Sequence, residues 1–263
     1  MIIDCHTHLS RFGHQGMSFD QIRNHLLADM NEYEVDCSFV LPDSEPGAEV
    51  ADLNTAGCLT RGHAQLLLLG TACISTLRQS VIESLDVLAA AGEIIGIKLY
   101  PGFELFYPDE GCCHGIYELC TRYDMPVVFH SGETMAEPWR EEYNHPREIA
   151  RVAERFPALK IVVAHFSQPH LGACRDLLLW FSNVCADISG LAHPDVIRTC
   201  GQNAIMRSLE AVAGLCPEKV LFGTDWPLCD VGEHLRLVDS LCIPQRSKRL
   251  ILGQNAAHLF GLG

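Results

Sequence analysis

The feature that most constrains the fold of this chain is a short apolar run that recurs eight times along its length. Each run is followed by a polar loop and then by a segment with helical patterning. Near-continuous apolar runs of this length are typical of parallel strands that are covered on both faces. The predicted strands lie at 2–6, 37–41, 66–74, 94–100, 127–130, 161–165, 184–188 and 220–223.

The segments between these runs have the pattern of amphipathic helices. In the first of them Ile22, Leu26 and Met30 recur four residues apart, which places them on one helix face. The predicted helices lie at 19–31, 77–91, 146–156, 171–181, 204–215 and 248–260. Alternation of strand and helix through eight units predicts an α/β fold, a (β/α)8 TIM barrel with parallel strands. A doubly wound open sheet is the alternative, but neither GxGxxG after the first strand nor a P-loop sequence occurs.

Composition narrows the class of protein further. The 263 residues are 48% hydrophobic, enough for a large core, and no linker interrupts them, so we expect one domain over 1–263. A net charge of −14 argues against nucleic acid and anionic membranes as partners. No apolar run approaches the ~20 residues of a membrane span, and no signal peptide is visible. Thirteen cysteines without a CxxC pair indicate reduced thiols, so we expect a cytoplasmic protein that acts on a small molecule. The oligomeric state stays open, a homo-oligomer included.

Polar residues stand where five of the predicted strands end. Barrel active sites lie at the carboxyl ends of the strands, so these residues are predicted to share one mouth. His6 and His8 are two apart in an extended segment, which turns both imidazoles to one side, as binding of one metal ion requires. The strand-end residues are His6, His8, Lys98, His130, His165 and Asp225.

Each of these residues has an ordinary explanation when it is taken alone. A histidine at a strand end is more often structural, Asp225 is well placed to cap a helix, and Lys98 is able to pair with a carboxylate or to reach the surface. Their joint placement at the ends of five strands is what indicates a site.

Six segments, spread from the first residues to the last, resemble the amidohydrolase superfamily, and within it the amidohydrolase-related (type 2) family, which also holds decarboxylases and hydratases. The resemblance covers the whole chain and does not specify a substrate. The segments are Ile-Ile-Asp-Cys-His-Thr-His at 2–8, Gly-Ile-Lys-Leu-Tyr-Pro at 96–101, Pro-Val-Val-Phe-His-Ser-Gly-Glu at 126–133, Lys-Ile-Val-Val-Ala-His at 160–165, Val-Leu-Phe-Gly-Thr-Asp-Trp-Pro at 220–227 and Ile-Leu-Gly-Gln-Asn-Ala-Ala-His-Leu-Phe-Gly-Leu at 251–262.

The resemblance implies a barrel with one or two divalent metal ions, most often zinc, at its mouth. In the family, residues that match His6, His8, His130 and Asp225 bind a metal ion. The residue that matches His165 binds a second metal or acts in catalysis beside a single one. In two-metal members a lysine on the fourth strand is carboxylated and bridges the ions, a part that Lys98 could take. Type 2 members more often use one metal.

The chemistry of these side chains favours hydrolysis. Imidazoles with a carboxylate suit Zn²⁺ rather than Ca²⁺ or Mg²⁺, and zinc lowers the pKa of a bound water to about 7. Asp225 is the expected acceptor of that water's proton, and His165 is expected to orient the water or bind the oxyanion. We therefore expect a hydrolase that cleaves an amide, lactone or ester bond of a small molecule.

Two alternatives use the same barrel differently. The first is a metal-dependent decarboxylase of an aromatic or unsaturated carboxylic acid, for which Arg11 and Arg140 are candidates to hold the carboxylate and Tyr100 and Trp226 to contact the substrate. Ordinary packing and a surface position are the plainer interpretations of these residues. The second is a binding protein that has lost its chemistry, which the competent residues at all five strand ends argue against. The loop over 101–114 is expected to determine substrate choice.

Overall fold

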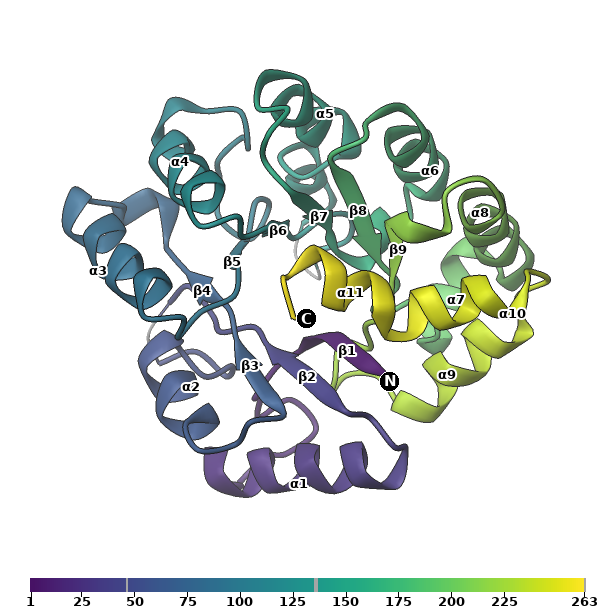
Figure 1. The fold of residues 1–263 in the computed structure, drawn as a ribbon, viewed down its shortest axis with the longest axis horizontal. Coiled ribbons are helices and arrows are strands. Elements are labelled where there is room, and N and C mark those ends of the chain that lie inside the picture. Colours follow the sequence, from purple (N-terminus) through teal and green to yellow (C-terminus); the bar gives the residue numbers. More distant parts are fainter. Residues whose placement is uncertain (46, 135–136, 263) are drawn as a thin grey trace.

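Short parallel strands alternate with helices along the whole computed structural model, which describes residues 1–45, 47–134 and 137–262. Figure 1 shows the strands arranged round a ring with most of the helices outside it. The strands are β1 (Ile3–Thr7), β2 (Cys37–Val40), β3 (Leu66–Leu68), β4 (Gly70–Thr71), β5 (Ile97–Leu99), β6 (Val127–Phe129), β7 (Ile161–Val163), β8 (Val184–Asp187) and β9 (Val220–Leu221).

The strands pair in parallel with their neighbours in sequence, in the orders β1-β2-β3 and β4-β5-β6-β7-β8-β9. β3 and β4 are two parts of one predicted run, separated by Leu69, whose N–H donates to the carbonyl of Val40 at 3.0 Å. On the other side, backbone hydrogen bonds link β1 to the segment at β9: Cys5 N–H donates to Phe222, and His8 N–H to Trp226. The predicted α/β fold of the TIM-barrel type is thereby confirmed.

The helices occupy the connections between strands. They are α1 (Phe19–Glu32), α2 (Leu53–Thr60), α3 (Gln79–Ala90), α4 (His114–Arg122), α5 (Pro146–Arg155), α6 (Leu171–Trp180), α7 (Pro194–Cys200), α8 (Gln202–Leu215), α9 (Val231–Ser240), α10 (Gln245–Arg249) and α11 (Asn255–Leu259). A π-helical stretch, Leu250–Gln254, joins α10 to α11, so the predicted final helix is continuous but not regular.

Helix prediction succeeded where local signals were strong. α1 begins with a capping box in which Ser18 accepts from the backbone of Gln21 and the Gln21 side chain accepts from that of Ser18. The sequence did not indicate α2, α4, α7 and α9. α2 and α4 each contain a glycine, Gly57 and Gly115, and α2 and α7 are short, so packing rather than local propensity forms them.

The interior of the ring holds a hydrophobic cluster of its own. Phe39, Val128 and Leu221 belong to this cluster together with Phe260, just after α11. In Figure 1 the C-terminal helix lies across the end of the ring near the N-terminus. Phe260 lies against Gly96, immediately before β5, so this helix covers the amino ends of the strands and the carboxyl ends remain for a site.

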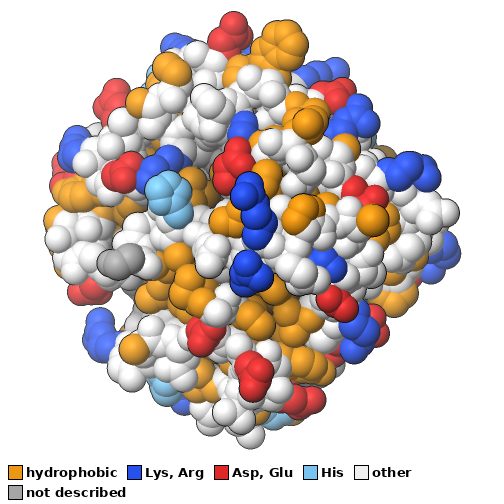
Figure 2. Space-filling view, turned by 45° about the vertical axis from the view of Figure 1, so that its right-hand side comes forward, with side chains coloured by type: hydrophobic (Ala, Val, Ile, Leu, Met, Phe, Trp, Pro, Cys, Tyr) orange, Lys and Arg blue, Asp and Glu red, His pale blue; other side chains and the backbone are white. Residues whose placement is uncertain are grey.

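One face of the molecule carries charged side chains of both signs. Figure 2 shows acidic and basic residues intermingled on one face, with hydrophobic side chains gathered between them. In the described ranges, none of the helices combines the length and apolar character that crossing a bilayer requires.

Candidate metal centre

Three of the predicted metal ligands meet at the carboxyl end of the barrel. Nε2 of His8 lies 3.3 Å from Oδ1 of Asp225, and Nε2 of His6 lies 3.7 Å from the same oxygen. One ligand atom from each residue falls within 4.8 Å of the others, which is close enough to hold one ion. His6 is buried, whereas the side chains of His8 and Asp225 are 13% and 15% exposed, so the group opens to solvent on their side.

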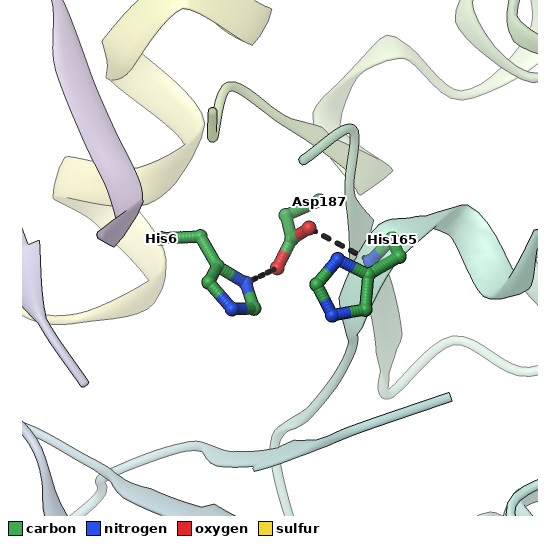
Figure 3. A group of neighbouring side chains, drawn as sticks. All are labelled: His6, His165 and Asp187. Atoms are coloured by element: carbon green, nitrogen blue, oxygen red, sulfur yellow. Dashed lines mark hydrogen bonds and ion pairs between the residues drawn. The ribbon is translucent and has the colours of Figure 1, made fainter. Parts of the chain in front are cut away.

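A second group contains an acidic residue that the sequence analysis missed. Asp187, the last residue of β8, lies between His6 and His165 (Figure 3). Nδ1–H of His6 donates to Oδ2 of Asp187 at 2.8 Å, and the backbone N–H of His165 donates to Oδ1 at 2.9 Å. An acidic residue inside an apolar strand was a usable signal, of the same kind as Lys98 in the fourth predicted strand.

His130, the fourth predicted ligand, follows β6 and lies beside His165. Its Nδ1 is 3.2 Å from Nε2 of His165, while its Nε2–H donates to the carbonyl of Glu133 at 3.1 Å. Through His165 it adjoins His6, since the His6 and His165 rings are 4.7 Å apart. The structure thus brings all five predicted strand-end sites into one continuous cluster, but it pairs His130 with His165 rather than with His8.

Lys98 of β5 is fully buried in this cluster. Its Nζ lies 3.5 Å from Nε2 of His6 and 5.2 Å from the ring centre of Tyr100. Burial lowers its pKa to about 8, and the charges of Asp187 and Asp225 oppose that shift only in part. A lysine of this kind carries a larger neutral fraction at pH 7 than a surface lysine does.

The protonation states of the cluster suit a cation. Burial and the charge of Lys98 lower the pKa of His6 to about 3, and burial also lowers the pKa of His130 and His165. Burial opposes ionisation of Asp225, but the surrounding histidines outweigh it and hold its pKa well below the usual range. The pKa of Asp187 is lowered in the same way, against burial, by His6 and by hydrogen bonds. Neutral imidazoles beside ionised carboxylates are the donors that zinc and similar ions take.

Hydrogen bonds also turn the correct ring nitrogens towards the centre. His8 donates Nδ1–H to the carbonyl of Leu41 at 2.7 Å, which leaves a lone pair on Nε2, the atom that faces Asp225. His130 donates Nε2–H to Glu133, which leaves a lone pair on Nδ1. A hydrogen bond from the nitrogen that does not bind is the usual support of a metal-binding histidine, so the residues fit a divalent ion.

The backbone is strained where it delivers these side chains. Asp225 has φ 73° and His165 has φ 60°, both in the left-handed region that non-glycine residues avoid. The turn at Asp225 is held by buried Asp4, which accepts from the hydroxyl of Thr224 at 2.6 Å and from its N–H at 3.0 Å. A β-carbon on Gly223 would lie 3.0 Å from Cβ of His6, so this position leaves space for the histidine.

Three of the four candidate substrate contacts have partners within the protein. The Arg11 guanidinium lies 4.3 Å above the ring of Phe19. The Tyr100 hydroxyl donates to the carbonyl of Pro42 at 2.6 Å, and Trp226 donates Nε1–H to Asp29 at 2.8 Å. The ring centre of Tyr100 also lies 5.2 Å from Nζ of Lys98, so this residue adjoins the cluster.

Arg140 organises the loop that was expected to determine substrate choice. Its Nη1 donates to the carbonyl of Phe103 at 3.1 Å. The ring of Phe103 lies edge-on to His130, with centres 4.6 Å apart, and is 45% exposed. Arg140 therefore helps to place an aromatic surface beside the cluster.

Comparisons with known proteins agree with this architecture. The profile of the amidohydrolase family matches residues 3–262. An uncharacterized TIM-barrel protein from Bordetella bronchiseptica has a TM-score of 0.78 and 16% identity, with 99% of this chain and 98% of that one covered. A probable 2-pyrone-4,6-dicarboxylic acid hydrolase from Acinetobacter baumannii with bound citric acid has 0.70 and 14%, with 99% of each chain covered.

A third similar structure is a dihydroxybenzoic acid decarboxylase from Polaromonas sp. JS666 with bound manganese and the inhibitor 2-nitroresorcinol. Its TM-score is 0.66 at 14% identity, with 99% of this chain and 97% of that one covered. The search among curated proteins found no match. At these identities the structural likeness shows the fold, whereas the profile match shows the family.

Proposed function

The chain belongs to the amidohydrolase family, a family of enzymes, and from this premise we propose that it is a metal-dependent hydrolase. The bond cleaved is an amide, lactone or ester bond of a small molecule. The observation that carries the proposal is the arrangement of neutral imidazoles and ionised carboxylates round His6 at the carboxyl ends of the strands. That end of a barrel is where the active sites of this fold lie.

The proposed ligands of a metal ion are His6, His8 and Asp225, with His130 as the fourth. Zinc is the ion that this donor set favours, and manganese is the alternative because the similar decarboxylase holds it. Such an ion, when bound, acts as a Lewis acid and lowers the pKa of a coordinated water.

The protein side chains have separate roles in this proposal. Ionised Asp225 accepts a hydrogen bond from the attacking water, takes its proton and passes it to the leaving group. His165, neutral and 3.2 Å from His130, is placed to accept a hydrogen bond from the attacking water and orient it, or to take up a proton and then donate to the developing oxyanion. Lys98 is free to attract an anionic substrate group or to serve as a bridging ligand after carboxylation.

Elemental analysis of protein purified without chelators or metal-affinity columns tests the metal. About one zinc or manganese per chain supports a single site of His6, His8, His130 and Asp225. About two per chain favours Lys98 as a carboxylated bridge. Protein that contains no metal and takes up none when zinc is added contradicts the proposal.

A screen of amides, lactones and esters tests the reaction itself. With a substrate in hand, Asp225→Asn should lower kcat by orders of magnitude, because the amide does not accept the proton, while metal content falls only modestly. Turnover that is unchanged in this variant contradicts the role of Asp225.

Decarboxylation of an aromatic acid is the second candidate. It is favoured by the exposed ring of Phe103 against His130 and by the likeness to the manganese-containing decarboxylase. A screen of carboxylated aromatics with CO₂ as the readout separates the two reactions. Release of CO₂ without hydrolysis of any ester, lactone or amide would replace the first proposal by the second.

We also propose that the chain is a single domain. Its compartment is proposed to be a reducing one, the cytoplasm. The thirteen cysteines are free thiols in the structure, and five of them are buried. Thiols in this number without pairing fit a reducing environment.

A further inference from the structure

The carboxylate of Asp187 and the hydroxyl of Ser189 form a buried network behind the metal centre. Ser189 follows β8, and both residues are inaccessible to solvent. Oδ1 of Asp187 accepts from the backbone N–H groups of His165 at 2.9 Å and Ser189 at 3.1 Å, and from the Ser189 hydroxyl. Oδ2 faces Nδ1 of His6 at 2.8 Å. The hydroxyl oxygen of Ser189 lies 2.8 Å from Nδ1 of His165.

The donors and acceptors available in this network determine where each proton lies. The Ser189 hydroxyl has one proton and three neighbours that could accept it: Asp187, His165 and His6. An ionised carboxylate is a stronger acceptor than a neutral ring nitrogen, so the proton goes to Asp187. The Ser189 oxygen then accepts from Nδ1–H of His165, and Asp187 accepts from Nδ1–H of His6.

From these contacts we infer that Asp187 and Ser189 are positioning residues that set the tautomers of His6 and His165. Both imidazoles carry their proton on Nδ1 and turn the lone pair of Nε2 towards the reaction centre. Asp187 acts on His6 directly and on His165 through Ser189. This inference rests on the proposed function, because it assigns the supporting hydrogen bonds of that same site.

On its far side, His165 faces His130. Its Nε2, now a lone pair, lies 3.2 Å from Nδ1 of His130, which is also a lone pair because His130 donates through Nε2 to Glu133. Two lone pairs at this distance repel each other, which raises the affinity of the pair for a cation or a proton. Ser189 therefore makes the His130–His165 pair into an acceptor of positive charge, whereas the opposite tautomer of His165 would form a neutral hydrogen bond with His130 and remove that capacity.

The tautomers can be read directly by long-range ¹H–¹⁵N correlation NMR of the full chain labelled at histidine, without metal, at pH 7.5. His6→Gln and His165→Gln assign the signals. We expect both residues in the neutral Nδ1–H form in the unmodified protein. In Ser189→Ala, His165 should shift towards the Nε2–H form while His6 stays unchanged. In Asp187→Asn, the amide donates to Nδ1 of His6, so His6 should change as well.

Zinc titration of the same proteins gives the second readout. We expect Asp187→Asn to weaken zinc binding by about 10- to 100-fold, the range for loss of a hydrogen bond behind a metal-binding histidine, because Asp187 accepts from the proposed ligand His6. Thr60→Val is the matched control, because it removes a buried hydroxyl that donates only within α2, at the carbonyls of Ala56 and Gly57, and it should change neither readout.

The inference is overturned if His165 is in the Nε2–H form in the unmodified protein, or if its signals are the same in Ser189→Ala. The milder Ser189→Ala keeps the test decisive if Asp187→Asn does not fold. Because the tautomers need no substrate, the expected spectra without any hydrolase activity would contradict the proposed function and leave the positioning role standing. Hydrolase activity in a protein with the opposite tautomers would support the proposed function and contradict the positioning role.

Discussion

Replacing Lys98 with methionine should make the metal-free protein more stable, although it removes a residue of the site. Lys98 is fully buried, and burial lowers its pKa from 10.5 to about 8. At pH 7 the amine is still mostly charged, so folding must bring out of water an ammonium group whose burial the charges of Asp187 and Asp225 offset only in part. Methionine has a similar length and no charge, which removes this cost.

The size of the effect follows from the pKa difference. Each pKa unit corresponds to about 1.4 kcal/mol, so Lys98→Met should raise the free energy of unfolding by about 3 kcal/mol at pH 7. The folded pKa lies below the unfolded one, so the folded protein binds fewer protons between pH 8 and 10.5, and the unmodified protein gains stability as pH rises through that window. The advantage of the variant should therefore fall to about half at pH 9.5.

Thermal unfolding in CO₂-free buffer, after metal removal, measures this difference. A gain of about 3 kcal/mol corresponds to a rise in Tm of roughly 6–12 °C in a chain of this size. Lys219→Met is the matched control, and its change in stability should have the opposite sign. Nζ of Lys219 donates to the carbonyls of Leu178, at 2.6 Å, and Phe181, so its loss should cost about 1 kcal/mol. A Lys98→Met protein that is less stable than the unmodified one, or equally stable at both pH values, would refute the reasoning.

Three further predictions concern the backbone, the metal and the mouth. Gly132→Ala should lower the free energy of unfolding by more than about 2 kcal/mol, measured by denaturant unfolding. The φ of Gly132 is +91°, and a β-carbon there would lie 1.9 Å from the carbonyl oxygen of Gln168. Gly172→Ala, where a β-carbon meets open space, is the control and should stabilise the protein by roughly 0.5 kcal/mol. Zinc added to metal-free protein should raise Tm by an amount that grows with the logarithm of its concentration, and a constant Tm would count against the site. Trp226→Phe should lower the free energy of unfolding by roughly 1 kcal/mol, because it removes the hydrogen bond to Asp29. An unchanged free energy of unfolding would contradict this contribution.

Much of the barrel was readable from the sequence because its signals are local. The strands are buried on both sides, which leaves runs such as 161–165 almost wholly apolar, and α1 carries both a capping box and a spaced apolar face. The helices that were missed, including α4 with Gly115, form because they pack against the barrel wall and not because their residues have a high helix propensity. Their existence depends on contacts that no window of sequence contains.

The site shows the same division. Histidine and aspartate at strand ends predicted one mouth, since all carboxyl ends of parallel strands meet there. Asp187 escaped notice because its role depends on facing His6, 181 residues away, and His165 at once. The roles proposed for Arg11 and Trp226 rested on side-chain type and loop position, and the structure shows their side chains against Phe19 and Asp29.

The sequence by itself determined the order of the elements and which residue types stand at the strand ends, because periodicity and chain order are properties of neighbours. Only the tertiary structure decided which ring nitrogen faces which partner. That choice depends on hydrogen bonds between different strands, such as His8 to Leu41 and His6 to Asp187, and on a barrel that excludes water from them. Burial then shifts the protonation equilibria, since the charged form of an imidazole or an amine is disfavoured only when the folded chain has removed its solvent.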